Sequence, residues 1–229
     1  MVKIFIDPGH GGTDPGAVGN GLKEKDVTLK IAKKVKAMLQ DYEGIQAKMS
    51  REGDQTVSLS QRVKMANDWN ADYFISIHIN AGGGFGFESF IWNGQYSSKV
   101  DTDKKRNALH DAIIKATSFN NRGKKQANFQ VIRETLMPAV LTENGFIDNV
   151  TDANNLKSDP FLTKIAQGHV DGLVTIFKLK KKSKQKPSTK PNKGKLFKVQ
   201  VGAFAVKENA ERLAADLQSK GYPVYIVEE

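Results

Sequence analysis

Apolar residues along the first 177 positions follow two alternating patterns. Short runs rich in β-branched and aromatic residues are typical of strands, and they occur at 2–6, 45–49, 73–79, 85–92 and 139–141, with a shorter candidate at 129–132. Between these runs, apolar residues recur at helical spacing over 27–39, 59–69, 104–117 and 161–177. Strands that alternate with helices predict an α/β fold, with a twisted, mostly parallel sheet and helices on both faces.

The pattern changes abruptly after this region. Residues 180–195 contain no aliphatic or aromatic side chain, and two prolines interrupt any helix. Beyond them, 196–201 reads as a strand, 207–220 as an amphipathic helix and 223–227 as a second strand, which together form a βαβ unit. We therefore expect a domain at 1–178, a Lys/Pro-rich linker at 179–194 and a small module at 195–229.

The charge of the chain is concentrated in this linker. The formal net charge is +10, and nine lysines without a single acidic residue lie between 178 and 195. The rest of the chain is close to neutral, so the basicity belongs to a solvated tether and not to a folded surface. Such a tether can attract polyanions, nucleic acid and acidic wall polymers included, but it predicts no specific nucleic-acid partner.

Composition removes several further possibilities. No run of 18 apolar residues is present, so we expect no membrane insertion. The first seven residues enter a strand pattern and do not resemble a signal peptide, which predicts synthesis and accumulation in the cytoplasm. Cysteine is absent, so a metal site would have to use histidine and carboxylate ligands.

Four residues with suitable chemistry stand close to the predicted strand and helix ends. His10 follows the first strand, Glu24 lies at the start of the first helix, His78 ends the strand at 73–79, and Glu143 ends the strand that begins at 139. In an open α/β sheet the carboxyl ends of parallel strands gather along one edge, where sites form. This topology makes it plausible that the four side chains converge.

If these side chains converge, their number and type are those of a catalytic zinc site. Two imidazoles and one carboxylate bind Zn²⁺ and leave its fourth position open for water, whose pKa falls towards ~7. A second carboxylate, which is not a ligand, can take the proton from this water and pass it to the leaving amine.

Each of these residues also has a structural interpretation when it is considered alone. His10 and His78 could be hydrogen-bonded structural histidines, and Glu24 could offset the dipole of its helix. Glu143 could form a buried salt bridge. His110 and His169 lie within helical patterns, where packing or surface roles are expected. Asp7 could orient His10 or simply cap the loop.

Several motifs occur in an order that is more specific than any single residue. They are IDPGHGG at 6–12, Glu24, SREGD at 50–54, LSQR at 59–62, SIHIN at 76–80 and PAVLTENGF at 138–146. This set resembles the zinc-dependent N-acetylmuramoyl-L-alanine amidases of bacterial cell division, of mother-cell lysis in spore formers and of phage endolysins, and the resemblance spans about 2–177.

The resemblance implies specific roles for these residues. His10, Glu24 and His78 match the ligands of one zinc ion, and Glu143 matches the catalytic glutamate. The implied reaction is hydrolysis of the amide between N-acetylmuramic acid and the L-alanine of peptidoglycan. Asn80 and Arg133 are candidates for substrate contact or for structural roles. The resemblance fits both a phage endolysin and a mother-cell-lysis enzyme, each released by cell lysis or through a holin.

The tail resembles part of a second family. The segment KLFKVQVGAF at 195–204 is similar to the opening of the sporulation-related repeat, a peptidoglycan-binding domain with a βαββαβ fold. The chain offers only one βαβ half, and about 35 residues is less than most domains need to fold unaided. We therefore expect two tails to pair, which would give a homodimer.

Other classes of protein fit the sequence less well. A nucleic-acid-binding protein would use the basic linker, but the tail lacks the aromatic stacking motif of RNA-recognition folds. A catalytically inactive wall-binding protein would not need the four residues above. A zinc peptidase of the His-Glu-x-x-His type and a phosphate-binding P-loop both lack their motifs.

Overall fold

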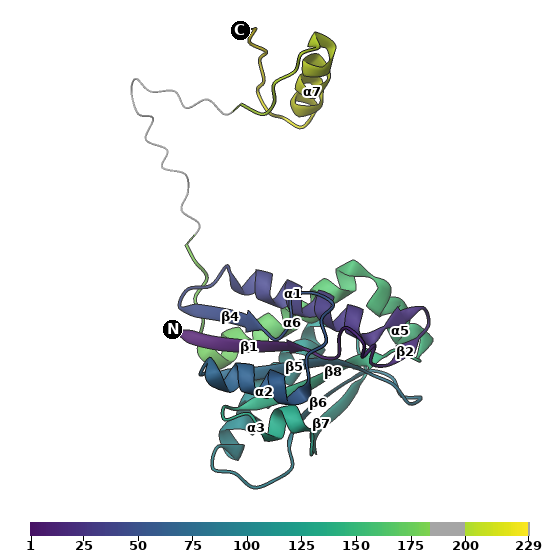
Figure 1. Ribbon diagram of the computed structural model, residues 1–229, viewed down its shortest axis with the longest axis vertical. Coiled ribbons are helices and arrows are strands. Elements are labelled where there is room, and N and C mark those ends of the chain that lie inside the picture. The colour runs from purple at the N-terminus through teal and green to yellow at the C-terminus, as the bar shows by residue number, and fades with distance from the viewer. Residues whose placement is uncertain (184–199, 229) are drawn as a thin grey trace. The chain divides into compact units, whose positions relative to one another are not determined.

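The computed structural model describes residues 1–183 and 200–228, which belong to two separate compact units, 1–183 and 184–229 (Figure 1). The first unit contains a six-stranded sheet in the order β4-β1-β5-β8-β6-β7. Its strands are β1 (Val2–Pro8), β4 (Ile45–Met49), β5 (Tyr73–Asn80), β6 (Phe87–Trp92), β7 (Asn121–Ala127) and β8 (Ala139–Phe146). A short antiparallel pair, β2 (Val18–Gly19) and β3 (Leu22–Lys23), lies outside this sheet.

Among the pairings of the six-stranded sheet, one is antiparallel and the others are parallel. The pairs β1–β4, β1–β5, β5–β8 and β6–β7 are parallel, whereas β6 runs antiparallel to β8. The start of β6 therefore lies beside the end of β8, with Glu88 opposite Glu143. The predicted α/β fold with a mostly parallel sheet is confirmed.

Helices cover both faces of the sheet. One face packs against α1 (Glu24–Leu39), α3 (Lys99–Ala116) and α6 (Asp159–Phe177), and α5 (Val150–Lys157) packs beside α6. Helix α1 buries Val27, Ile31 and Val35 at the spacing that the sequence indicated. The opposite face packs against α2 (Leu59–Asp68) and the short α4 (Gln130–Arg133), around Phe5 and Phe74. None of the helices in the described ranges is long and apolar enough to cross a bilayer.

Two expectations about elements in the first unit were wrong. The strand predicted at 129–132 is replaced by α4, and the sixth strand of the sheet is β7, which the apolar pattern did not indicate. Strand β7 has the sequence NRGKKQA and none of its residues is fully buried, because it lies at the edge of the sheet. Lysines at a sheet edge are common, since they discourage pairing with another chain.

The second unit contains α7 (Lys207–Ser219), within the predicted helix. The predicted strand at 223–227 is wrong, because these residues form no strand in the described part of the tail. Of the other predicted strand, residues 196–199 lie outside the described residues and residues 200–201 form no strand. No side chain of α7 is buried, so the tail as described has no core of its own.

Candidate metal centre

The loop after β1 holds His10 in an unusual backbone conformation. His10 has φ 61°, in the left-handed region. At two other positions of this loop, Gly9 and Gly16, there is no room for a side chain. A Cβ atom on Gly9 would lie 2.3 Å from the His78 ring, and one on Gly16 would lie 2.6 Å from Glu24 Oε2. The glycines therefore allow the loop to approach the side chains of β5 and α1 closely.

Three of the four candidate residues meet at this loop. Glu24 lies between the two histidines, with Oε2 3.1 Å from His10 Nε2 and Oε1 3.0 Å from His78 Nδ1. One potential ligand atom from each residue lies within 4.8 Å of the others. A tetrahedral ion with bonds of 2.0–2.1 Å separates its ligand atoms by about 3.3 Å. The residues therefore fit a zinc ion by both donor type and spacing.

Further hydrogen bonds orient these three side chains. Asp14 Oδ2 lies 2.8 Å from His10 Nδ1, so a proton on Nδ1 leaves Nε2 with a lone pair that faces Glu24. Glu24 also accepts hydrogen bonds from the backbone N–H groups of Ala17 at 2.9 Å and Ile79 at 3.0 Å. The side chains of His10 and His78 remain 24% and 17% exposed, so solvent can reach the centre.

The sequence left open whether Asp7 orients the His10 ring or caps the loop. In the structure, the Asp7 carboxylate forms no hydrogen bond with that ring. This buried carboxylate accepts hydrogen bonds from Ser50, Ser76 and Arg62. Arg62 in turn donates to the carbonyl oxygen of His10 at 2.7 Å. Asp7 is therefore linked to the backbone of the loop that follows β1 (residues 9–16, hereafter the metal loop) through Arg62. Asp14, which sequence reasoning missed, is the residue that contacts the His10 ring.

The electrostatics of the centre favour an ionised Glu24. Burial raises its pKa, but hydrogen bonds and charge interactions with His10 and His78 outweigh burial and hold the pKa well below its usual value. Burial lowers the pKa of His10, whereas Glu24 and Asp14 raise it, and the net effect is a raised pKa. A negative carboxylate between two imidazoles is a favourable environment for a divalent cation.

Glu143 lies on the strand next to His78. Residues 78 and 143 are register partners in β5 and β8, and Glu143 is also the partner of Glu88 in β6. The Glu143 atom Oε2 is buried and has no hydrogen-bond partner among the described residues. Burial raises the pKa of Glu143 well above its usual value, and the negative charges of Glu24 and Glu88 add to this effect. An unpaired buried carboxyl group is costly, and groups of this kind cluster at functional sites.

A polar cluster that sequence reasoning missed lies beside Glu143. Glu88, which is only 3% exposed, accepts a hydrogen bond from Asn80 at 2.7 Å and one from Arg122 Nε at 2.9 Å. Lys125 forms a third contact with the same carboxylate. The signal in the sequence was a glutamate within the apolar run at 85–92, analogous to Glu143 at the end of its own apolar strand.

Comparison with known proteins identifies the family. The family model described as N-acetylmuramoyl-L-alanine amidase matches residues 4–175, and the SPOR domain model matches 193–229. The chain belongs to the N-acetylmuramoyl-L-alanine amidase family. The first match covers the unit that holds the metal centre, which is hereafter the amidase domain, and the second covers the tail.

Individual relatives agree with this family. A sporulation-specific N-acetylmuramoyl-L-alanine amidase of Bacillus subtilis (strain 168) is 51% identical over 223 residues, which cover 97% of this chain and 83% of the relative. An endolysin of Bacillus phage SPP1 is 46% identical over 199 residues, 84% of this chain and 73% of the endolysin.

Among solved structures, the catalytic domain of the amidase CwlV from Bacillus (Paenibacillus) polymyxa var. colistinus is similar, with a TM-score of 0.73 and 36% identity. This similarity covers 79% of the chain and all of the CwlV structure.

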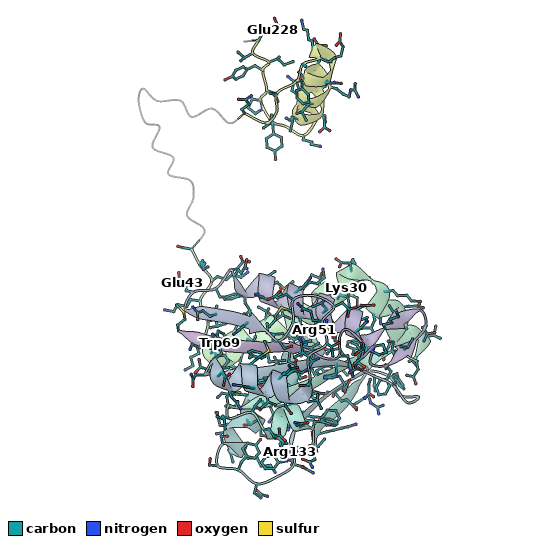
Figure 2. All side chains as sticks on the ribbon, in the orientation of Figure 1. Lys30, Glu43, Arg51, Trp69, Arg133 and Glu228 are labelled. Atoms are coloured by element: carbon teal, nitrogen blue, oxygen red, sulfur yellow. The ribbon has the colours of Figure 1, made fainter. Side chains whose placement is uncertain are left out.

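The two candidates for substrate contact occupy different places in the amidase domain. Asn80 ends β5 and hydrogen-bonds to Glu88, close to Glu143. Arg133 ends α4, and its hydrogen bonds go to Asn128 and Glu134, both at 2.8 Å. Figure 2 shows Arg133 well apart from Arg51, which hydrogen-bonds to the Gly9 carbonyl of the metal loop at 2.9 Å. A substrate contact by either residue stays a prediction.

The other two histidines of the amidase domain are buried away from the metal centre. His110 lies between Ser89 and Asn121, with both hydrogen bonds at 2.9 Å. His169 contacts Thr142 and the carbonyl oxygen of Ile165, and burial lowers its pKa to about 4. Both histidines make the packing contacts that their helical positions indicated.

Proposed function

We infer that this chain hydrolyses the amide between N-acetylmuramic acid and the L-alanine of peptidoglycan. The amidase family, with relatives named for this activity, supports the reaction. The observation that carries the proposal is the meeting of His10, Glu24 and His78 next to Glu143, whose Oε2 atom is buried and unpaired within the described chain. The combination supplies a metal centre and a proton carrier, which together are sufficient for metal-assisted amide hydrolysis.

We propose that His10, Glu24 and His78 bind one zinc ion. Nitrogen donors from imidazole together with one carboxylate oxygen are typical ligands of catalytic zinc. A zinc ion held at this centre supplies Lewis acidity, which polarises a carbonyl oxygen and makes water more acidic. The hydrogen bond between Asp14 and His10 Nδ1 fixes which nitrogen faces the ion, and the backbone donors to Glu24 fix its carboxylate.

Glu143 is then the group that moves the proton. Its unpaired Oε2 atom can accept a proton from attacking water and deliver it to the nitrogen of the leaving alanine. The raised pKa favours retention of that proton until the amide nitrogen accepts it. The strand pairing fixes the position of Glu143, because its neighbours on both sides belong to the same sheet.

Digestion of purified peptidoglycan tests this function directly. We expect new N-terminal alanine residues in the digest, measured by N-terminal labelling and mass spectrometry of the released peptides. N-termini of other residues would indicate cleavage within the stem peptide, and new reducing ends would indicate glycan cleavage. No released product would favour a wall-binding protein without activity. Each of these outcomes would overturn the proposed reaction.

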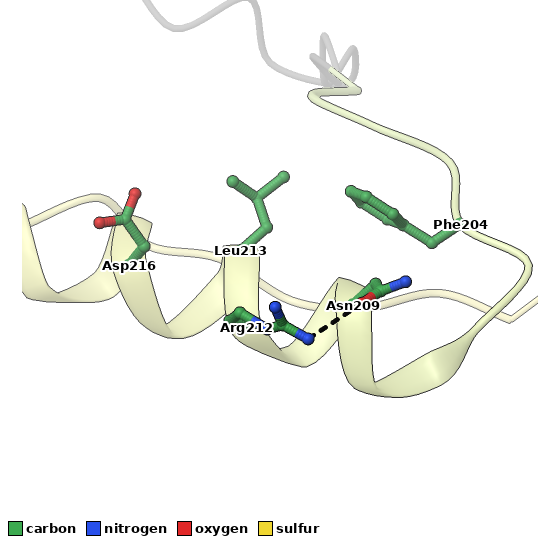
Figure 3. A pocket seen from close by; sticks show the side chains of 5 residues that line it. All are labelled: Phe204, Asn209, Arg212, Leu213 and Asp216. Atoms are coloured by element: carbon green, nitrogen blue, oxygen red, sulfur yellow. Dashed lines mark hydrogen bonds between the residues drawn. The ribbon is translucent and has the colours of Figure 1, made fainter.

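The tail exposes apolar side chains that its described residues do not bury. Its exposed apolar side chains are Val201, Phe204, Val206, Tyr222, Tyr225, Ile226 and Val227. Figure 3 shows Phe204 beside Leu213 of α7, at a shallow hollow of about 360 Å³ that Asn209, Arg212 and Asp216 also line. These apolar groups are uncovered because a single helix and its flanking segments cannot bury them.

We propose that the tail binds peptidoglycan and that two tails pair to cover these apolar surfaces. The SPOR match supports the binding role. We propose a second copy of the tail as the partner that covers these apolar surfaces, because it would contribute a matching set of apolar side chains. The endolysin relative supports a route in which the protein is made in the cytoplasm and acts on the wall.

Truncation separates the tail from the amidase domain. A chain that ends at Ser183, the last residue of the first compact unit, should sediment as a monomer and fail to pellet with insoluble peptidoglycan, whereas the full chain should dimerise and pellet. A chain that ends at Lys195 retains the basic linker and serves as the matched control. If this control pellets to the same extent as the full chain, the linker, and not the tail, is the part that binds the wall. A monomeric full chain would contradict the pairing.

A further inference from the structure

The polar cluster beside Glu143 consists of Glu88, Asn80, Arg122 and Lys125 and is hereafter the Glu88 cluster. It contains two positive charges and one negative charge. Two cations of the edge strand β7, Arg122 and Lys125, share one buried carboxylate oxygen of Glu88. Their own side chains remain 30% and 38% exposed, respectively. The group therefore has one net positive charge that faces solvent, beside a strand that carries the proposed proton carrier.

Arg122 retains free hydrogen-bond donors in this arrangement. Its Nε atom donates to Glu88, while its terminal nitrogens donate to no acceptor among the residues that the structure describes. The guanidinium group also lies over the Phe146 ring, at 4.7 Å from the centroid. Contacts with Glu88 and Phe146 fix the orientation of the guanidinium plane, so its free edge is prepared for a planar anion such as a carboxylate.

The cluster lies at a suitable distance from the scissile bond. Neighbouring strands are about 4.8 Å apart, so Glu88 is about 10 Å from His78, with β8 between them. The arginine side chain contacts the carboxylate of Glu88, so its charge lies near this distance. An extended peptide advances about 3.5 Å per residue. Two residues of a peptide held with its first amide at the metal centre would span about 7 Å. A hydrogen bond of about 2.9 Å between the carboxylate of the second residue and the Arg122 guanidinium would cover the remaining distance.

We propose that Arg122 and Lys125 bind a carboxylate of the substrate, on the stem-peptide residue that follows L-alanine. Glu88 and Asn80 are positioning residues, since Glu88 holds both cations and Asn80 holds Glu88. This inference rests on the proposed amidase function. It assigns substrate preference to the edge strand β7, which does not contribute a metal ligand.

A pair of soluble muropeptides tests the subsite. The two substrates carry either D-glutamic acid with a free α-carboxylate or D-isoglutamine with an amide at the second stem position. We expect wild-type protein to cleave the acid with a kcat/KM about tenfold higher than for the amide, mainly through KM. The variants Arg122→Gln and Lys125→Met should bring this ratio close to one.

The control variant is Lys124→Gln on the same strand. Lys124 pairs with Asp111 on α3 and lies outside the cluster, so the preference for the acid should not change. If Arg122→Gln lowers the rates on both substrates equally, the cluster is only structural and the inference is wrong. Equal cleavage of the two substrates by wild-type protein would also contradict it. If wild-type protein cleaves neither substrate nor intact peptidoglycan, the proposed function itself fails.

Discussion

Replacement of Glu143 by glutamine is expected to lower the rate of alanine release from peptidoglycan by about 10²–10⁴-fold, the usual contribution of a positioned acid–base group. Glutamine has nearly the same shape, but its amide cannot take a proton from water and return it to the leaving nitrogen. The metal ligands are unchanged, so the variant should bind zinc with the same stoichiometry. Initial rates and metal analysis of the purified protein measure both quantities.

Glu43→Gln provides a matched control for this result. Glu43 is an exposed glutamate of the amidase domain, outside the sheet and the metal centre, so its replacement should leave the rate unchanged. Activity of Glu143→Gln within a few fold of wild type would remove Glu143 from its assigned role. Loss of zinc from this variant would instead show that Glu143 helps to form the metal site.

Removal of the metal is expected to abolish hydrolysis completely and to lower the melting temperature. A ligand that binds only the folded state stabilises it by about 2.7 kcal/mol at a concentration of one hundred times Kd, and chelation removes this contribution. Addition of Zn²⁺ should restore both activity and melting temperature. Assays and thermal scans after dialysis against a chelator, with and without added zinc, test this prediction.

Glu24→Gln should reproduce the effect of the chelator without any chelator present. The carboxylate of Glu24 lies between both histidines, and a neutral amide in its place removes the negative charge of the centre. Glu52→Gln, at a surface residue that pairs with Lys36, is the control. Full activity of chelated protein with no detectable metal would contradict a metal-dependent reaction.

The sequence contained most of the information about where the metal centre forms. His10 follows strand β1 and His78 lies near the end of strand β5, and these parallel strands end at the same edge of the sheet. Glu24 begins the helix that the first loop reaches. This convergence depends only on topology, which the alternation of strand and helix patterns predicts.

The contacts around these residues could not be predicted in the same way. Glu88 stands near the start of its strand, and it reaches the same edge only because β6 is antiparallel to β8. The alternation of strand and helix patterns predicts parallel pairing and does not indicate this one antiparallel pair. Asp14 contacts His10 because the glycine-rich loop folds back, and that conformation depends on backbone angles that side-chain polarity does not encode. Strand β7 was missed because it is polar along its whole length.

The polar character of β7 also restricts how copies of this protein can associate. An outer strand with free N–H and C=O groups can recruit the outer strand of another molecule, which leads to continuous intermolecular sheets. Arg122, Lys124 and Lys125 oppose such recruitment, because their partly exposed charges would lose contact with water against another strand. Concentrated solutions of residues 1–183 should therefore remain free of sheet-mediated aggregates, and neutralisation of these three charges should be the shortest route to fibrous assembly.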